Sequence, residues 1–306
     1  MKKRIYVIGT GKVGSAFCFE MKDKGYDICF LSGRNQGIFE TLVNEINPVT
    51  FSSKTEKDFI KDSDIVIICV QDRFIKDIVK EIADMNIDLT DKYFLHSSGS
   101  ESTDVFDYEC FNPDKCVSLH PIQTFDKISF ANNHLMENIY FGIEGGKSGK
   151  DIAIKIINDL NSKYIEIPKE KKYLYHSACV VSSNFLITLL NISSEILGSI
   201  GIEKGKTFEI FKPIINKTLS NISENGLVNS LTGPFERNDL ETISNHLNSL
   251  NKEIPSLIPF YTLLGMETVK VAFKKESLNM KNVISLLDLM NDYIVNESSG
   301  LNKTIN

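Results

Sequence analysis

Ile5–Gly14, which reads IYVIGTGKVG, decides the fold of the N-terminal half of this 306-residue chain. A short apolar run stops at Gly9, and Gly9, Gly11 and Gly14 follow at G-x-G-x-x-G spacing before the helix-compatible run 15–24. Such glycines permit a sharp exit from the strand, close approach of a pyrophosphate and tight packing of the helix on the strand. The pattern therefore predicts a dinucleotide-binding turn that ends at a helix N-terminus. Its expected members are Gly9, Thr10, Gly11, Lys12, Val13 and Gly14.

The residues after the second predicted strand, 27–31, indicate which dinucleotide binds. An NAD site usually carries an acid there for the ribose hydroxyls, whereas an NADP site needs a cation for the 2′-phosphate. The stretch SGRN contains no acid and one arginine. We therefore predict NADP in preference to NAD, with Ser32, Arg34 and Asn35 as contacts. The alternative is that Arg34 is only a solvated loop charge.

Three further strand ends are expected to reach the same edge of the sheet. The apolar run 64–70 is typical of a parallel strand buried on both faces, so we predict that Cys69, Val70 and Gln71 contact the cofactor. The runs 93–96 and 116–120 also lead into polar residues, and loops at this edge often carry chemistry. From these ends we predict roles for Ser97, Ser98, His120 and Gln123. Ordinary turn chemistry and a buried structural histidine remain the alternatives.

The hydrophobic pattern changes near the middle of the chain. Residues 1–167 read as an α/β domain with a mostly parallel sheet of the Rossmann type, and the segment PKEKK at 168–172 reads as a linker. From Tyr173 onward, apolar residues recur at spacings of three and four, which predicts a long amphipathic helix followed by further helices. We therefore predict an all-α second domain over residues 168–306. Its apolar helix faces favour a homodimer.

Polar residues stand out at two places in the helical half. His176 and Asn184 are eight residues apart, so they share one face of the long helix. In the non-helical stretch 231–239, Thr232 and Arg237 have no obvious structural duty, so we predict that they contact an anionic substrate, although Arg237 could simply pair with a neighbouring acid.

Composition restricts the class of protein. Hydrophobic residues make up 42% and charged residues 24% of the chain, values typical of a globular protein. A formal net charge of -6 argues against nucleic acid or an anionic membrane as the main partner. No apolar run approaches the ~20 residues that span a bilayer, and no signal peptide is evident, so we expect a cytoplasmic protein that binds a small molecule. The six cysteines form no C-x-x-C pair, so no metal site is predicted.

The order of these motifs resembles the Rossmann-like NADP oxidoreductases that carry a helical C-terminal domain of unknown function. The resemblance rests on GTGKVG, on HPIQTF from His120, on the stretch from His176 to Asn184 and on the TGP segment from Thr232 through Arg237. One departure is Asn238, where a glycine is expected. The wider group includes 6-phosphogluconate, 3-hydroxyacid, ketopantoate and pyrroline-5-carboxylate dehydrogenases or reductases, which implies an active site between the domains.

The resemblance also implies roles for particular residues. In the hydroxyacid members a lysine precedes the matching Asn184 by four residues, but this chain has Val180 there. Any acid or base must then lie elsewhere, and His120 is the first choice with His176 in reserve. Asn184 and Ser98 are expected to position the substrate. Hydride transfer between the nicotinamide and a carbonyl, hydroxyl or imine carbon of a small anionic metabolite is the predicted activity, and a non-catalytic NADP-binding sensor is the alternative.

Overall fold

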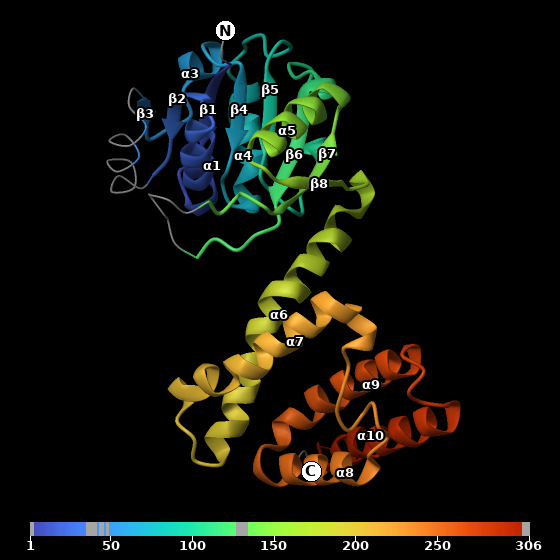
Figure 1. Ribbon diagram of the computed structural model, residues 1–306. Helices are drawn as coiled ribbons and strands as arrows, with labels where there is room; N and C mark the ends of the chain where they lie inside the picture. The colour runs from blue at the N-terminus through green and yellow to red at the C-terminus, as the bar shows by residue number, and fades with distance from the viewer. Residues whose placement is uncertain (1–2, 35–41, 43–45, 47–48, 127–133, 302–306) are drawn as a thin grey trace. The chain divides into compact units, whose positions relative to one another are not determined.

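The structure is a computed structural model that describes residues 3–34, 42, 46, 49–126 and 134–301. The chain divides into two compact units, Met1–Phe185 and Leu186–Asn306, and each is described by itself (Figure 1). The first unit is an α/β domain around one sheet, and the second unit is helical. This fold class is the one that the sequence predicts.

An eight-stranded sheet in the order β3-β2-β1-β4-β5-β6-β7-β8 forms the centre of the first unit. All neighbouring strands pair in parallel except β6 and β7, which are antiparallel. The strands are β1 (Arg4–Ile8), β2 (Asp27–Ser32), β3 (Thr50–Ser52), β4 (Ile65–Ile68), β5 (Tyr93–His96), β6 (Cys116–Pro121), β7 (Tyr140–Gly145) and β8 (Lys163–Glu166). The short edge strand β3 was not predicted, because three residues offer too little alternation to be recognised.

Helices cover both faces of the sheet, which explains why the central strands are apolar without interruption. In β1, Ile5 and Val7 pack into one core, whereas Tyr6 and Ile8 pack into the core on the opposite face. Successive side chains of a strand point to opposite faces, so a strand covered on both sides has no polar positions. The helices of this unit are α1 (Lys12–Asp23), α3 (Lys57–Lys61), α4 (Asp72–Ala83) and α5 (Lys147–Asp159).

Helix α6 (Lys172–Ser199) begins within the first compact unit, and the predicted domain boundary stays a prediction. The first compact unit continues beyond residue 167 to Phe185. The first turns of α6 belong to this unit because Lys172, Tyr175 and His176 contact the loops and strands at the sheet's carboxyl edge. Lys172 is only 2% exposed and is therefore no solvated linker residue.

The second unit is built from α7 (Thr207–Asn229), α8 (Leu240–Glu253), α9 (Ile258–Lys274) and α10 (Met280–Leu301). Its core lies among the last three of these helices and includes Ile243, Val269 and Met290. A positive φ of 79° at Gly226 interrupts the helical backbone of α7. No strand occurs among the described residues of this unit, in agreement with the predicted all-α half.

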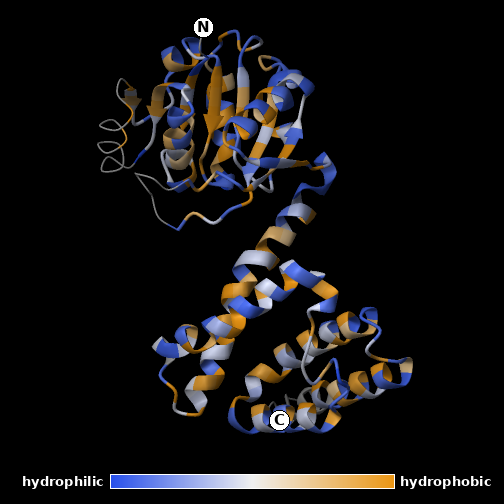
Figure 2. Ribbon diagram, in the orientation of Figure 1, coloured by the Kyte–Doolittle hydropathy of each residue, from blue (hydrophilic) through white to orange (hydrophobic). Residues whose placement is uncertain are grey.

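Exposed apolar side chains occur along α6, as they do along α7 and α9. Among the described residues, α6 is the helix that is long and apolar enough to cross a membrane by length and composition, and its most apolar 18-residue window has a mean hydropathy of 1.4 and contains no buried residue. This corrects the expectation that no segment reaches that length. The same test is also passed by core helices of soluble proteins, so it is weak support for a membrane span. Figure 2 shows the apolar segments along this helix.

Candidate active site

A cavity of about 550 Å³ lies where β1, β2, β3 and β4 end. Parallel sheets bind ligands at this carboxyl edge, beside the point where the strand order reverses. The strand order places β1 between β2 and β4, so the loops after these three strands meet here. Eight of the predicted cofactor residues line the cavity together: Gly9, Thr10, Gly11, Ser32, Arg34, Cys69, Val70 and Gln71.

The three glycines of the opening motif have three different surroundings. Gly9 adopts a φ of 99°, and a Cβ there would lie 2.5 Å from the Cys69 carbonyl oxygen. A Cβ on Gly14 would lie 1.9 Å from the Gly9 carbonyl oxygen, so this glycine lets α1 pack on the turn. A Cβ on Gly11 would meet nothing within 4 Å. The space over Gly11 is therefore open, and its occupation by a pyrophosphate stays a prediction.

The start of α1 supplies the donors for such a group. Gly11 is the N-cap residue and has no side chain to satisfy the free N–H groups of the first turn. Lys12, Val13 and Gly14 contribute backbone from this first turn rather than lining the cavity. A helix N-terminus with free N–H groups favours an anion. These residues fit the diphosphate of a dinucleotide.

Alanine at Gly11 and at Gly14 should have opposite consequences. We expect Gly14→Ala to lower the free energy of unfolding by about 1–3 kcal/mol, because its Cβ overlaps a backbone carbonyl. Gly11→Ala should fold with the parent's stability, yet bind NADPH at least about 10-fold more weakly, because the methyl group occupies the space for the pyrophosphate. Urea unfolding and fluorescence titration with NADPH check both. Unchanged NADPH affinity in Gly11→Ala would contradict the assignment of this turn.

Cations and hydroxyls gather at the other end of the cavity. Arg34 lies over the Phe74 ring at 5.6 Å and lines the cavity with Ser53, Lys54 and Thr55 from the loop after β3. The Ser32 hydroxyl donates to the Lys54 carbonyl at 2.6 Å and also contacts the Tyr6 hydroxyl at 2.5 Å. Ser32, at the end of β2, thus links the loop after β3 to Tyr6 of β1. Asn35 lies outside the described residues.

A second group of predicted residues meets at the ends of β5 and β6. The His120 and His176 rings are 5.9 Å apart between centroids and nearly perpendicular. Gly99 lies against both, since a Cβ there would be 2.6 Å from His176 Nδ1 and 2.9 Å from His120 Nε2. Tyr175, which the sequence analysis missed, places its hydroxyl 2.7 Å from His120 Nδ1. The structure therefore brings the two histidines together.

Burial sets the charge of this cluster. It lowers the pKa of His120 to about 4, with the Lys172 ammonium and His176 acting in the same direction. The pKa of the Tyr175 hydroxyl is raised, mainly by burial. His120 is consequently neutral near pH 7 and can accept a proton there, whereas donation requires a proton from elsewhere. The buried Nδ1 of His176 has no hydrogen-bond partner in the structure, which leaves one polar atom of the cluster unused.

Several predicted polar residues have structural duties. The Ser98 hydroxyl accepts from the backbone N–H groups of Ser100 and Glu101 at 3.2 and 3.0 Å. The Gln123 side chain accepts from the Thr124 N–H at 2.8 Å. Ser97 donates its backbone N–H to the Ile68 carbonyl and follows β5 directly. These contacts agree with the turn chemistry that was the alternative for this region, and roles in substrate binding stay predictions.

The remaining predicted residues lie on α6 or in the second unit. Asn184 is about two turns beyond His176 on α6, near the end of the first unit. Thr232 and Arg237 are exposed in the loop before α8. In that loop Asn238 has a φ of 55°, a left-handed conformation that asparagine tolerates better than most residues. This explains how asparagine can replace the expected glycine. Roles for Asn184, Thr232 and Arg237 stay predictions.

The residue that sequence reasoning missed most clearly is Lys172, whose amine lies inside the first unit. Its Nζ donates to the Ser118 hydroxyl at 2.5 Å and to the Ser98 carbonyl at 3.1 Å. Burial lowers its pKa to about 8. Three lysines occur in the segment 168–173, so nothing in the sequence marks this one as buried. In the part of the chain that the structure describes, no cluster of histidine, cysteine and acidic residues could hold a metal ion.

The fold and the glycine turn define the first unit as a Rossmann-type nucleotide-binding domain. Comparison with known families then assigns it further. Residues 4–92 match the family described as NADP oxidoreductase coenzyme F420-dependent, and residues 139–268 match a domain of unknown function, DUF2520. These two matches agree with the resemblance to NADP oxidoreductases that carry this C-terminal domain. No protein with a curated function matches the sequence.

Solved structures share this fold across most of the chain. Protein TM1727 from Thermotoga maritima is 24% identical with a TM-score of 0.70, and the match covers 89% of this chain and 99% of that one. A candidate NADP oxidoreductase from Bacteroides fragilis is 20% identical with a TM-score of 0.68, covering 88% and 98%. Pyrroline carboxylate reductase from Plasmodium falciparum, solved with NADP bound, is 13% identical with a TM-score of 0.57, covering 90% and 97%. These likenesses show that the fold is shared.

Proposed function

We propose that this protein is an NADP-dependent oxidoreductase that transfers hydride between the nicotinamide and a carbonyl, hydroxyl or imine carbon of a small anionic metabolite. The observation that carries the proposal is the cavity in which the free space over Gly11 continues to Arg34. An acid is absent after β2, and a cation stands in its place. This arrangement suits a ribose 2′-phosphate better than free ribose hydroxyls.

The chain's own residues would bind, orient and move a proton. The first turn of α1 would hold the diphosphate, and Arg34 would hold the 2′-phosphate in a bidentate contact. When bound, NADP supplies the hydride chemistry. Neutral His120 would accept the hydroxyl proton in the oxidative direction, with Tyr175 fixing the ring through Nδ1. His176 is the second candidate, and Asn184 with Ser98 would position the substrate.

Turnover with a panel of compounds tests the proposal. The parent should bind NADPH and oxidise it in the presence of at least one carbonyl or cyclic imine that carries a carboxylate. A matched set of imines and carbonyls of the same carbon skeleton would separate the two substrate classes. NADPH binding without oxidation by any member would instead support a non-catalytic sensor on the same fold.

We also propose a cytoplasmic homodimer, without nucleic-acid or membrane partners, because α6 leaves large apolar side chains uncovered. Val181 is 57% and Phe185 is 54% exposed, and both lie on the predicted apolar stripe. An uncovered stripe of this kind marks an interface more often than bare surface. A second copy would cover this helix.

The charge substitutions Val181→Glu and Phe185→Glu should therefore produce monomers. Sedimentation velocity of the parent should show a dimer, and each variant should raise the dimer dissociation constant at least about 100-fold, since a carboxylate cannot be buried unpaired without a large cost. Ser182→Glu, on the same helix but not on the stripe, is the control and should remain dimeric. A monomeric parent would contradict the proposal.

A further inference from the structure

Lys172 carries a positive charge into the interior without a counter-ion. Lys172 is 2% exposed, and its Nζ contacts two uncharged oxygens, those of the Ser118 hydroxyl and the Ser98 carbonyl. Among the ion pairs of the described residues, none includes Lys172. A buried ammonium in this situation is unfavourable by several kcal/mol unless something compensates for it. The protonated amine of Lys172 is therefore a buried charge with no ion-pair partner among the described residues.

The charged groups that face Lys172 are engaged with other partners. Glu144 of β7 accepts from the Thr103 backbone and hydroxyl, and Asp72 of α4 accepts from the Ser100 hydroxyl at 2.7 Å. Glu101, after β5, pairs with Lys76 at 3.2 Å. His96 of β5 and His120 of β6 also face the ammonium, and the pKa of each is lowered, to about 3 and about 4. Both imidazoles are thus neutral near pH 7 and offer no negative charge.

Hydrogen bonding does not require a lysine at this position. The Ser118 hydroxyl also donates to the Ser98 carbonyl, at 3.1 Å. If an apolar side chain replaced Lys172, each of these two oxygens would keep the other as its partner. A buried polar group is costly mainly when it loses its last partner. A purely structural role therefore explains Lys172 poorly.

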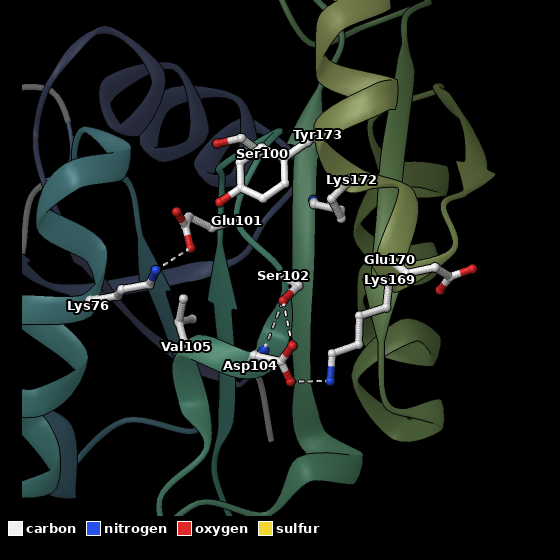
Figure 3. A pocket seen from close by; sticks show the side chains of 10 residues that line it. All are labelled: Lys76, Ser100, Glu101, Ser102, Asp104, Val105, Lys169, Glu170, Lys172 and Tyr173. Carbon is white, nitrogen blue, oxygen red and sulfur yellow. Dashed lines mark hydrogen bonds and ion pairs between the residues drawn. The ribbon is translucent and has the colours of Figure 1, made fainter.

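A cavity of about 490 Å³ lies against Lys172, at the start of α6 (Figure 3). Ser100, Ser102 and Tyr173 line it, and its other lysines are neutralised, because Lys76 pairs with Glu101 and Lys169 pairs with Asp104. An ammonium has three N–H donors, and two of those on Lys172 are used. The third donor has no acceptor among the described residues.

We propose that this cavity is the subsite for the carboxylate of the substrate, and that the free N–H donor of Lys172 binds it. The Ser98–Gly99 turn contacts Lys172 through the Ser98 carbonyl and both imidazoles through Gly99, so a carboxylate held here adjoins the histidine cluster. The inference rests on the proposed function and narrows the substrate to a carboxylic acid.

Malonate serves as the probe, titrated calorimetrically at constant ionic strength set by chloride. The parent should bind it saturably with a dissociation constant in the millimolar range. Lys172→Met should bind it at least about 10-fold more weakly, while its unfolding midpoint equals or exceeds that of the parent, because the buried charge is gone. Lys169→Met is the matched control, since Lys169 lines the same cavity but already pairs with Asp104. It should bind malonate as the parent does.

The pH dependence of the parent gives a test that needs no variant. Burial lowers the pKa of Lys172 to about 8, and only the protonated amine attracts an anion. Malonate affinity should therefore fall as pH rises through about 8, by roughly 10-fold one unit above it. Equal malonate affinity in Lys172→Met and the parent, or no loss of affinity across this range, would overturn the proposal. Because these measurements contain no NADPH, they stand whether or not the protein oxidises NADPH.

Discussion

Replacing Arg34 by aspartate should weaken NADPH binding roughly 10- to 100-fold and leave NADH binding within about two-fold of the parent. A hydrogen-bonded contact between an arginine and a phosphate is worth about 1.5–3 kcal/mol, and NADH lacks the phosphate concerned. Arg34 lines the cavity over Phe74, from the loop directly after β2. Fluorescence titration of the parent and the variant with both nucleotides measures the effect.

Arg73 provides the control for this measurement. It also lies over the Phe74 ring, at 4.6 Å, but it does not line the cavity. Arg73→Asp makes the same change of charge a short distance away, so a general electrostatic effect would appear in both variants. We expect NADPH affinity in Arg73→Asp to stay within about three-fold of the parent. Equal weakening of NADPH and NADH by Arg34→Asp would defeat the preference for NADP.

Removing the His120 side chain should lower kcat/KM by about 10²- to 10⁴-fold in the oxidative direction, with NADPH affinity unchanged. This range is the usual contribution of a positioned acid or base. Since the pKa of His120 is about 4, the parent's rate should fall only as pH drops toward that value, not near 6.5. His120→Ala should lack this acidic limb. The substrate is the alcohol or amine that corresponds to the compound identified by the panel, and pH–rate profiles of both proteins provide the measurement.

His246 is a matched control for His120. Its Nδ1 lies 2.8 Å from the Tyr261 hydroxyl, so it makes the same type of contact in the second unit. His246→Ala removes an equivalent histidine–tyrosine pair and should leave kcat/KM unchanged. If His120→Ala turned over substrate like the parent, the acid–base assignment would pass to His176 or Lys172.

The central strands of the sheet and the glycine-rich turn could be predicted from the sequence, because each depends on residues that are close together in the chain. The glycines at 9, 11 and 14 match steric constraints that one strand and one helix impose, whatever the rest of the chain does. Uninterrupted apolar runs such as Ile65–Ile68 likewise reflect burial on both faces of a sheet. His120 and His176 were both singled out from the sequence, because His120 lies at the end of a predicted strand and His176 lies near the start of the predicted long helix.

Residues whose role depends on distant contacts could not be predicted in this way. Lys172 lies in a lysine-rich segment, and only the packing of α6 against Ser98 and Ser118 buries it. The sequence shows that Ser98 has a hydroxyl near a strand end. Only the structure of the turn shows that this hydroxyl accepts hydrogen bonds from two backbone N–H groups. Lys54 lines the nucleotide cavity because it follows β3, and that strand is too short for its pattern to be recognised in the sequence.

Transfer of deuterium from NADPH that carries deuterium in both positions at the nicotinamide C4 tests the central claim most directly. The parent is incubated with the labelled cofactor and the active compound of the panel, and the product is analysed by mass spectrometry. If the protein is an NADP-dependent oxidoreductase, the product carries the deuterium at the carbon that was reduced. If NADPH binds and no compound ever acquires the label, the protein is not an oxidoreductase, and the cavity over Gly11 serves binding alone.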